Sequence, residues 1–346
     1  MRFTRWENLL ASLERPLVFF DTETTSPNPK HAKVVEFAVA AYGPASLLDG
    51  SEPDATTLAA RERSLVPGLL FAASWRATPG TDPRTDRGLA RASRIHGITA
   101  DMLVNPKGQP LPGVLLPYQL RAEVDACLSA GYPCGFNSME YDDVVLRGHH
   151  LDADPCCTRV DVLRVYRGVT SRAPQPEAIT GGFLAEGGLK LLTPDCCDIE
   201  AGTTTEHHRD TLSACSRVVL GARHEGAHGA LADSMRSAEV LAGIMELWPR
   251  TCPGSIDGLE LLTLDPGPPW CGWDRMLKLE LGEWIFMKGE HRGLALAEVD
   301  RGYLGWMCGR GRGKKPDFEA GTVREIERHL AGQGPSPRYL GADVAQ

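Results

Sequence analysis

The sequence lacks the long apolar stretches that membrane proteins need. No run of about 18 apolar residues occurs in the 346 residues, so we expect no transmembrane helix and no membrane partner. The opening segment, MRFTRWENLLASLERP, is charged throughout and has no apolar core of the secretory type. We therefore expect no export signal and a cytoplasmic location.

An excess of positive charge is also missing. The formal net charge is -8, which argues against a protein that coats nucleic acid through its bulk charge. It does not exclude an enzyme that binds a few phosphates locally. Apolar residues at 42% and charged residues at 24% are ordinary values, and the length allows one large domain with a smaller one.

Paired zinc-binding knuckles are absent as well. The ten cysteines include the doublets Cys156-Cys157 and Cys196-Cys197, and histidine doublets lie nearby at 149–150 and 207–208. Structural zinc sites usually space their cysteines by two to four residues, and adjacent cysteines cannot easily point at one ion. We expect reduced thiols that pack as small apolar groups.

Alternating and branched apolar residues predict a sheet near the N-terminus. We expect strands at Leu17–Thr22, 32–43 and 61–68, whereas residues 70–92, rich in Pro, Gly, Thr, Asp and Arg, indicate a loop insertion. The segment 132–150 reads as a short strand, a turn and a helix. Helical spacing predicts further helices at Trp6–Leu13, 116–131, Ala230–Trp248 and 319–332.

Proline and glycine clusters suggest the domain boundaries. Prolines at TCPGS and LDPGPPWCG predict a linker over residues 251–272. We expect a main domain at 1–250, a small accessory domain at 273–333 and a tail at 334–346.

Two acidic residues follow the first apolar strand in the stretch FFDTETT. Side chains alternate faces along a strand, so Asp21 and Glu23 emerge on the same side and Thr22 on the other. Two carboxylates that close repel each other, and one is pushed towards protonation unless a positive charge lies between them. The pair is a candidate metal site.

Three further residues have ordinary explanations when each is taken alone. Asp142, in GFNSMEYDDVVL, fits the first turn of a helix, where acidic residues are favoured. Asp233, in HGALAD, fits the same position of another helix, and His228 fits a surface loop.

Taken together, the motifs FFDTETT, RIHGIT, GFNSMEYD and HGALAD carry a resemblance. Their order and spacing over about residues 15–247 resemble the DEDDh exonucleases, the DnaQ-like branch of the ribonuclease H-like superfamily. The resemblance implies an α/β fold, a ribonuclease H-like mixed sheet flanked by helices, with a small C-terminal domain added. It also implies that Asp21, Glu23, Asp142 and Asp233 bind metal and that His228 is the general base.

That set of residues suits phosphodiester hydrolysis. Carboxylate oxygens are preferred by Mg²⁺ and Mn²⁺, and two such ions can activate a water and stabilise the leaving oxygen. We expect two Mg²⁺ (or Mn²⁺) and a 3′-to-5′ exonuclease that removes nucleotides from single-stranded or frayed DNA ends. An RNA-trimming exonuclease and a nonhydrolytic nucleic-acid-binding module are the alternatives. A homodimer and an association with other DNA-processing proteins both stay open.

The resemblance also nominates contacts to the terminal nucleotide. The backbone N–H of Thr24 is one of these contacts. For Ile98 and Met102, the alternative is that they pack in the protein core. The remaining candidate substrate contacts are His96, Gly97, Ile98, Thr99, Met102 and Asn137.

The chain departs from the family pattern in two places. Ser26 and Pro27 replace the usual Gly and Leu after DTETT. The second motif reads Asn-x-x-x-Tyr-Asp, a longer form similar to relatives of exonuclease I and exonuclease X, and this favours DNA over RNA. It leaves open whether Asp142 or Asp143 is the ligand, with Asp142 preferred because it follows the aromatic residue. Asp161 matches an acidic position of the family, and we expect it to cap a helix.

The segment 284–307 resembles a small domain of unknown function that is appended to exonucleases of this type. Basic and aromatic residues of this segment, together with the basic loop that follows it, could bind a single strand. The alternative is that the aromatic residues form the core of the small domain and that the basic loop is solvated; we favour this alternative for the aromatic residues. The residues concerned are Lys288, Arg292, Tyr303, Trp306, Arg310, Arg312, Lys314 and Lys315.

Overall fold

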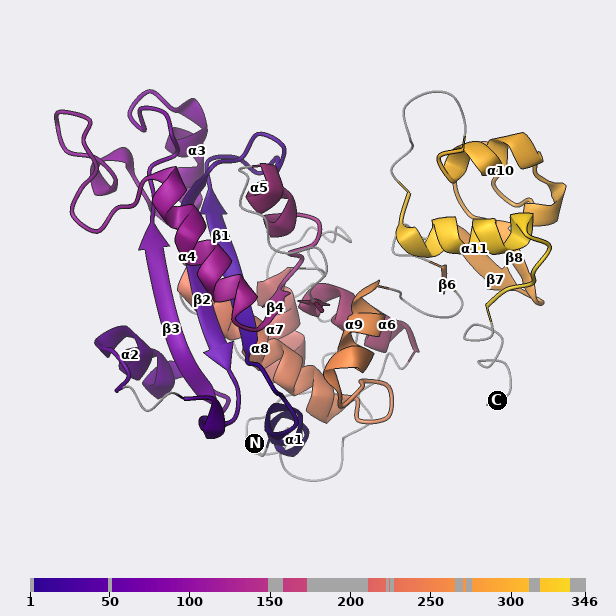
Figure 1. Cartoon of the computed structure of the whole chain (residues 1–346), viewed down its shortest axis with the longest axis horizontal. Helices are drawn as coiled ribbons and strands as arrows, with labels where there is room; N and C mark the ends of the chain where they lie inside the picture. Colours follow the sequence, from indigo (N-terminus) through magenta and orange to yellow (C-terminus); the bar gives the residue numbers. More distant parts are fainter. Residues whose placement is uncertain are drawn as a thin grey trace. The chain divides into compact units, whose positions relative to one another are not determined.

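The computed structural model divides the chain into two compact units, Met1–Leu259 and Glu260–Gln346 (Figure 1). The cysteine and histidine doublets at 149–150, 156–157, 196–197 and 207–208, and the basic loop 311–317, lie outside the described residues. The residues that the structure describes are 3–48, 52–148, 158–172, 211–221, 224, 227–264, 270–271, 276–310 and 318–336.

A five-stranded mixed sheet forms the centre of the first unit. Its strand order is β3-β2-β1-β4-β5, with β1 antiparallel to β2 and parallel to β4. This confirms the mixed sheet of an α/β fold expected from the sequence. The strands are β1 (Leu17–Thr24), β2 (Val34–Tyr42), β3 (Leu69–Arg76), β4 (Tyr132–Gly135) and β5 (Val160–Asp161).

Helices cover both faces of this sheet. The helix α4 lies across one face of β1 and β2, and α8 lies behind the other (Figure 1). Helices α4 and α8 confirm the two helices predicted at 116–131 and 230–248. The helices are α1 (Thr4–Ala11), α2 (Ala55–Arg63), α3 (Arg87–His96), α4 (Pro117–Ser129), α5 (Asp142–Gly148), α6 (Val162–Arg172), α7 (Leu212–Leu220), α8 (Ala230–Leu247) and α9 (Ile256–Leu264).

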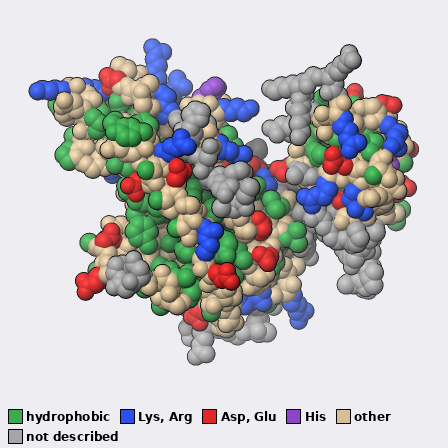
Figure 2. All heavy atoms as spheres, in the orientation of Figure 1, with side chains coloured by type: hydrophobic (Ala, Val, Ile, Leu, Met, Phe, Trp, Pro, Cys, Tyr) green, Lys and Arg blue, Asp and Glu red, His purple; other side chains and the backbone are tan. Residues whose placement is uncertain are grey.

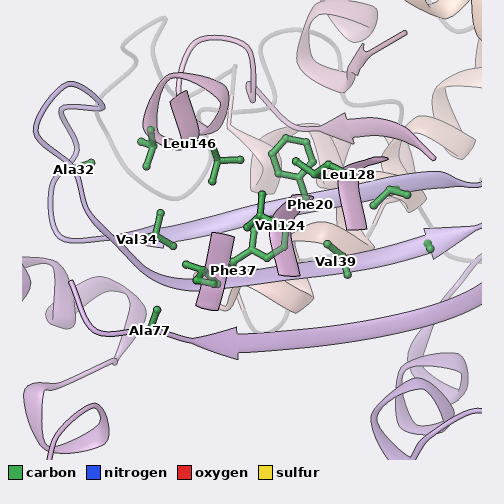
Figure 3. Close-up of a cluster of buried hydrophobic side chains, with 13 residues drawn as sticks. Phe20, Ala32, Val34, Phe37, Val39, Ala77, Val124, Leu128 and Leu146 are labelled. Atoms are coloured by element: carbon green, nitrogen blue, oxygen red, sulfur yellow. The ribbon is translucent and has the colours of Figure 1, made fainter. Parts of the chain in front are cut away.

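Strand alternation divides β1 between two buried surfaces. Phe20 packs with Val124 and Leu128 of α4 on one face (Figure 3). Phe19 points to the other face, where its ring meets Trp6 and is 5.8 Å, centroid to centroid, from Tyr42. The same alternation carries Asp21 and Glu23 onto the α8 face, so burial of the phenylalanines fixes the direction of the carboxylates.

The third strand lies later than the sequence predicts. Residues 61–63 end α2, whose first turn is capped by Asp54, and β3 begins only after the turn at Pro67-Gly68. Gly68 has a φ of 90°, which glycine adopts without strain. The loop predicted over 70–92 is likewise wrong, because it contains most of β3 and the start of α3. Turn residues are confined to the part of that segment between the two elements.

The predicted linker at 251–272 also needs correction, since it contains the helix α9. Proline, glycine and serine precede this helix, and Ser255 Oγ accepts a hydrogen bond of 3.3 Å from Gly258 N. Leu259 and Leu262 are buried. The breakers at 253–255 therefore lie just before a short helix.

The second unit has its own sheet and core. Three antiparallel strands in the order β6-β7-β8 pack against two helices. Inside, Trp284 Nε1 donates a hydrogen bond of 3.1 Å to Glu325 Oε2. Tyr303 is partly buried against this core, but Trp306 is 38% exposed. The elements are β6 (Trp270–Cys271), β7 (Leu277–Glu280), β8 (Glu283–Phe286), η5 (Leu296–Glu298), α10 (Arg301–Met307) and α11 (Ala320–Leu330).

Two further observations concern the described residues alone. None of their helices is both long and apolar enough to cross a bilayer. Their cysteines, at 127, 134, 215, 252, 271 and 308, are all free thiols.

Candidate active site

Three carboxylates converge where β1 passes under the start of α8. Each of Asp21, Glu23 and Asp233 offers one oxygen, and these oxygens all lie within 4.8 Å of one another. The helix is fixed over the strand because Ser234 Oγ donates a hydrogen bond of 3.3 Å to Ala38 O, and Ala38 is the β2 partner of Asp21. Residues distant in sequence thus form one acidic cluster.

The fourth predicted acid approaches from α5. Thr22 donates to Asp142 Oδ1 twice, from its backbone N at 3.1 Å and from its hydroxyl. Its neighbour Asp143 instead forms an ion pair with Arg159, with a distance of 2.6 Å between Arg159 Nη1 and Asp143 Oδ2. Asp142 is therefore the acid directed to the site, and Asp143 has a structural partner.

All four acids line one cavity of about 290 Å³. His228 and Asn137 also line it, together with aromatic residues from the turn before α5. The remaining lining residues are Thr22, Phe136, Tyr141, Thr211 and Leu212.

Burial and mutual repulsion raise the pKa values of these acids. Burial, followed by the charges of Asp142, Asp233 and Glu23, raises the pKa of Asp21 well above its usual range. Burial also raises the pKa of Glu23 to about 8, and those of Asp142 and Asp233 to about 7. Buried carboxylates whose negative charges repel one another are stabilised by a divalent cation, which prefers oxygen ligands of this kind. The residues therefore fit such an ion.

His228 lies at the edge of the cavity on the loop before α8. It is exposed and has a φ of 67°, which is uncommon for a residue other than glycine. Its backbone donates a hydrogen bond to the carboxylate of Asp233. The strained backbone is thus held next to a predicted ligand, at a residue that lines the cavity.

Asp161 supports the turn that leads to Asp142. Its carboxylate accepts hydrogen bonds from the backbone N of Asn137 at 3.1 Å, Met139 at 3.2 Å and Arg164 at 3.2 Å. The last of these caps α6, as expected from the sequence. The first two hold a turn in which Asn137 has a φ of 59°.

Sequence reasoning missed two residues. Glu36 is the β2 partner of Glu23, and its charge contributes to the raised pKa of Asp21 and of Glu23. Its only signal in the sequence is a single acid within an apolar run. His224 Nε2 lies 3.1 Å from Asp233 Oδ1, and burial lowers the pKa of this histidine to about 4. No pattern in the sequence marked His224.

The structure places some of the predicted substrate contacts near the site and others away from it. His96 ends α3 close to the Thr24 backbone and near the charges of Glu36 and His228. Ile98 is 3% exposed within a hydrophobic cluster, so the expected substrate contact is corrected to a packing role.

Of the other predicted contacts, Asn137 lines the cavity, whereas Thr24, Gly97, Thr99 and Met102 do not. Gly97 and Thr99 are exposed, and Met102 is partly buried. The Thr24 hydroxyl donates to Ser26 O at 3.0 Å.

Fold and site together define an α/β protein with a carboxylate-lined cavity suited to cations. Neither a protein-family model nor a curated protein matches the chain. Among solved structures it is similar to exonuclease I from Methylocaldum szegediense, with 19% identity and a TM-score of 0.42. That alignment covers 68% of this chain and 42% of the other, so this chain spans less than half of that protein.

The chain is also similar to E. coli exonuclease I in complex with a dT13 oligonucleotide. Here the identity is 16% and the TM-score 0.48, over 92% of this chain and 68% of the other. A complex of exonuclease I with SSB-Ct aligns over 93% of this chain and 69% of the other, with 14% identity and a TM-score of 0.49.

Proposed function

We propose that this protein is a metal-dependent 3′-to-5′ exonuclease that removes nucleotides from single-stranded or frayed DNA ends. The observation that carries this proposal is the convergence of four acids and His228 on one cavity. The preference for DNA rests on the long form of the second motif. We further propose that the protein acts in the cytoplasm.

In this proposal, Asp21, Glu23 and Asp233 hold the cations, and Asp142, oriented by Thr22, completes the set. Two Mg²⁺ or Mn²⁺ ions would supply a Lewis acid for the phosphate and lower the pKa of a bound water. The four acids do not bind the nucleic acid directly, because their negative charge repels the phosphates.

His228 acts as the general base in the proposal, taking a proton from the attacking water at an imidazole nitrogen. Its exposed position on the cavity edge suits an exchange of protons with solvent. His224 is the other histidine near Asp233, but its lowered pKa and buried side chain suit a neutral group that orients the carboxylate.

A direct test uses single-stranded DNA labelled at its 5′ end, incubated with Mg²⁺, Mn²⁺ or a chelator. We expect a ladder shortening from the 3′ end and mononucleotide products only when metal is present. Asp142→Asn should abolish the ladder. Glu140→Gln, which changes an exposed carboxylate two residues away, should leave it intact.

Two outcomes would contradict the proposal. Degradation of a matched RNA but not of DNA would assign the protein to RNA trimming. Tight binding of the DNA without any hydrolysis, in every metal, would assign it to the nonhydrolytic class.

A further inference from the structure

The helix α3 carries a row of arginines that the proposed active site does not use. Arg87, Arg91 and Arg94 are all exposed. At 3.6 residues per turn they fall within about 60° of one another and opposite Leu89, the buried residue of the helix. They form a stripe about 10 Å long, which we call the α3 stripe.

The charges of the α3 stripe are not balanced by nearby acids. None of the three arginines forms an ion pair with another described residue. The acid that begins the helix, Asp86, is engaged by the backbone N of Gly88 and Leu89 and lies 3.5 Å from Lys33 Nζ. Figure 2 shows Lys and Arg side chains gathered over this end of the first unit.

Repulsion within the stripe opposes helix formation, and only Arg94, in the last turn, is favoured by the helix dipole. Like charges three or four residues apart on a helix repel, at about 0.2–0.5 kcal/mol per pair. Arg87, in the first turn, also faces the positive end of the helix dipole. An ordinary solvated face mixes both signs, and in a chain of net charge -8 acidic partners are plentiful. The uncompensated stripe therefore suggests an anionic ligand.

The helix α3 is fixed to the strand that bears the catalytic acids. A Cβ on Gly88 would lie 2.5 Å from Thr25 O, so the start of the helix touches the chain just after β1. Its last residue, His96, lies beside the Thr24 backbone and near His228. The α3 stripe therefore ends two residues before the one that lies beside the proposed site.

We infer that the α3 stripe binds the phosphodiester backbone of single-stranded DNA upstream of the terminus in the cavity. This inference rests on the proposed function. Two or three successive phosphates fit a stripe of this length, and charge complementarity provides affinity without reading sequence. An acidic site repels phosphates, so a cationic track outside the cavity would hold the strand while the cations act on its end.

The test is binding of fluorescein-labelled dT15 to the full chain in chelator, measured by anisotropy at several salt concentrations. The triple change Arg87→Ala, Arg91→Ala and Arg94→Ala should raise Kd roughly tenfold. It should also reduce the slope of log Kd against log salt concentration by about 2. The triple change to lysine keeps the charge and should retain most of the affinity.

A matched control changes three exposed arginines on other helices: Arg63→Ala, Arg121→Ala and Arg217→Ala. We expect its Kd and salt slope to stay within twofold of the wild-type values. Circular dichroism should show the same helix content in every variant. Equal Kd and slope for the α3 variant and the control would overturn the inference.

Failure of the stripe and failure of the proposed function are distinguishable. Because binding is measured in chelator, it does not depend on turnover, whereas hydrolysis of p-nitrophenyl thymidine monophosphate with Mn²⁺ tests the cavity alone. Hydrolysis of this ester with no effect of the stripe on DNA binding would reject only the stripe. Equal displacement of dT15 by polyglutamate of matched charge, or tighter binding of U15, would also overturn the assignment to DNA.

Discussion

The pKa of Glu23 predicts how the stability of the metal-free protein depends on pH. Burial and the charges of Asp233 and Glu36 raise this pKa from 4.5 to about 8. Between those values the folded state keeps a proton that the unfolded state has released. The free energy of unfolding therefore falls as pH rises, by about 1.4 kcal/mol per pH unit for each proton retained.

The expected magnitude follows for Glu23 alone. Over the two pH units from 5.5 to 7.5, one retained proton corresponds to roughly 2.7 kcal/mol of lost stability. Glu23→Gln has no proton to retain, so its stability should decline less steeply than that of the wild type. Partial exposure of the site reduces the difference, and we expect about 1–3 kcal/mol in favour of the variant at pH 7.5.

The assay is guanidinium denaturation in chelator at half-unit steps of pH, followed by circular dichroism. The comparison of the wild type with Glu23→Gln measures the titration of Glu23 together with its effect on Asp21, whose pKa the Glu23 charge raises. Glu62→Gln, which changes an exposed carboxylate of α2, is the matched control and should follow the wild-type curve. Adding Mg²⁺ should stabilise the wild type more than the variant. Parallel curves for wild type and Glu23→Gln would refute the reasoning about the buried charges.

Three other changes test the supporting residues. His228→Gln should lower kcat by a factor of about 100 to 10,000 while the Kd for DNA in chelator stays within twofold, as single-turnover kinetics would measure. Asp161→Ala leaves the N–H groups of Asn137 and Met139 without acceptors and should cost about 1–3 kcal/mol, measured by denaturation, and also slow hydrolysis. Gly131→Ala places a Cβ 2.2 Å from Pro16 O and should destabilise the pairing of β1 with β4 by about 1–3 kcal/mol, a loss visible as faster amide exchange in β1.

Local patterns in the sequence predicted the elements whose signal is periodic. The run Leu-Val-Phe-Phe before Asp21 predicted both the strand and the common face of the two acids, and the apolar spacing after Gly229 predicted α8. Strand β3 was placed too early because Pro67 and Gly68 form the turn before it rather than ending it. Composition marks turns, but it does not say on which side of a turn the strand lies.

The parts of the site that could not be predicted depend on pairing between distant segments. Glu36 faces Glu23 only because of the register of β1 with β2, and a single sequence does not specify that register. The choice between Asp142 and Asp143 required knowing that Arg159 lies beside the second of them. His224 lies beside Asp233 although nine positions separate them in the sequence, and no periodic signal links the two.

Anomalous diffraction from crystals soaked in Mn²⁺ tests the central claim most directly. The account predicts manganese peaks in the cavity, bounded by carboxylate oxygens of Asp21, Glu23 and Asp233, and their loss in Asp21→Asn. Absence of manganese from this cavity, at a concentration that supports hydrolysis of DNA by the same preparation, would contradict it.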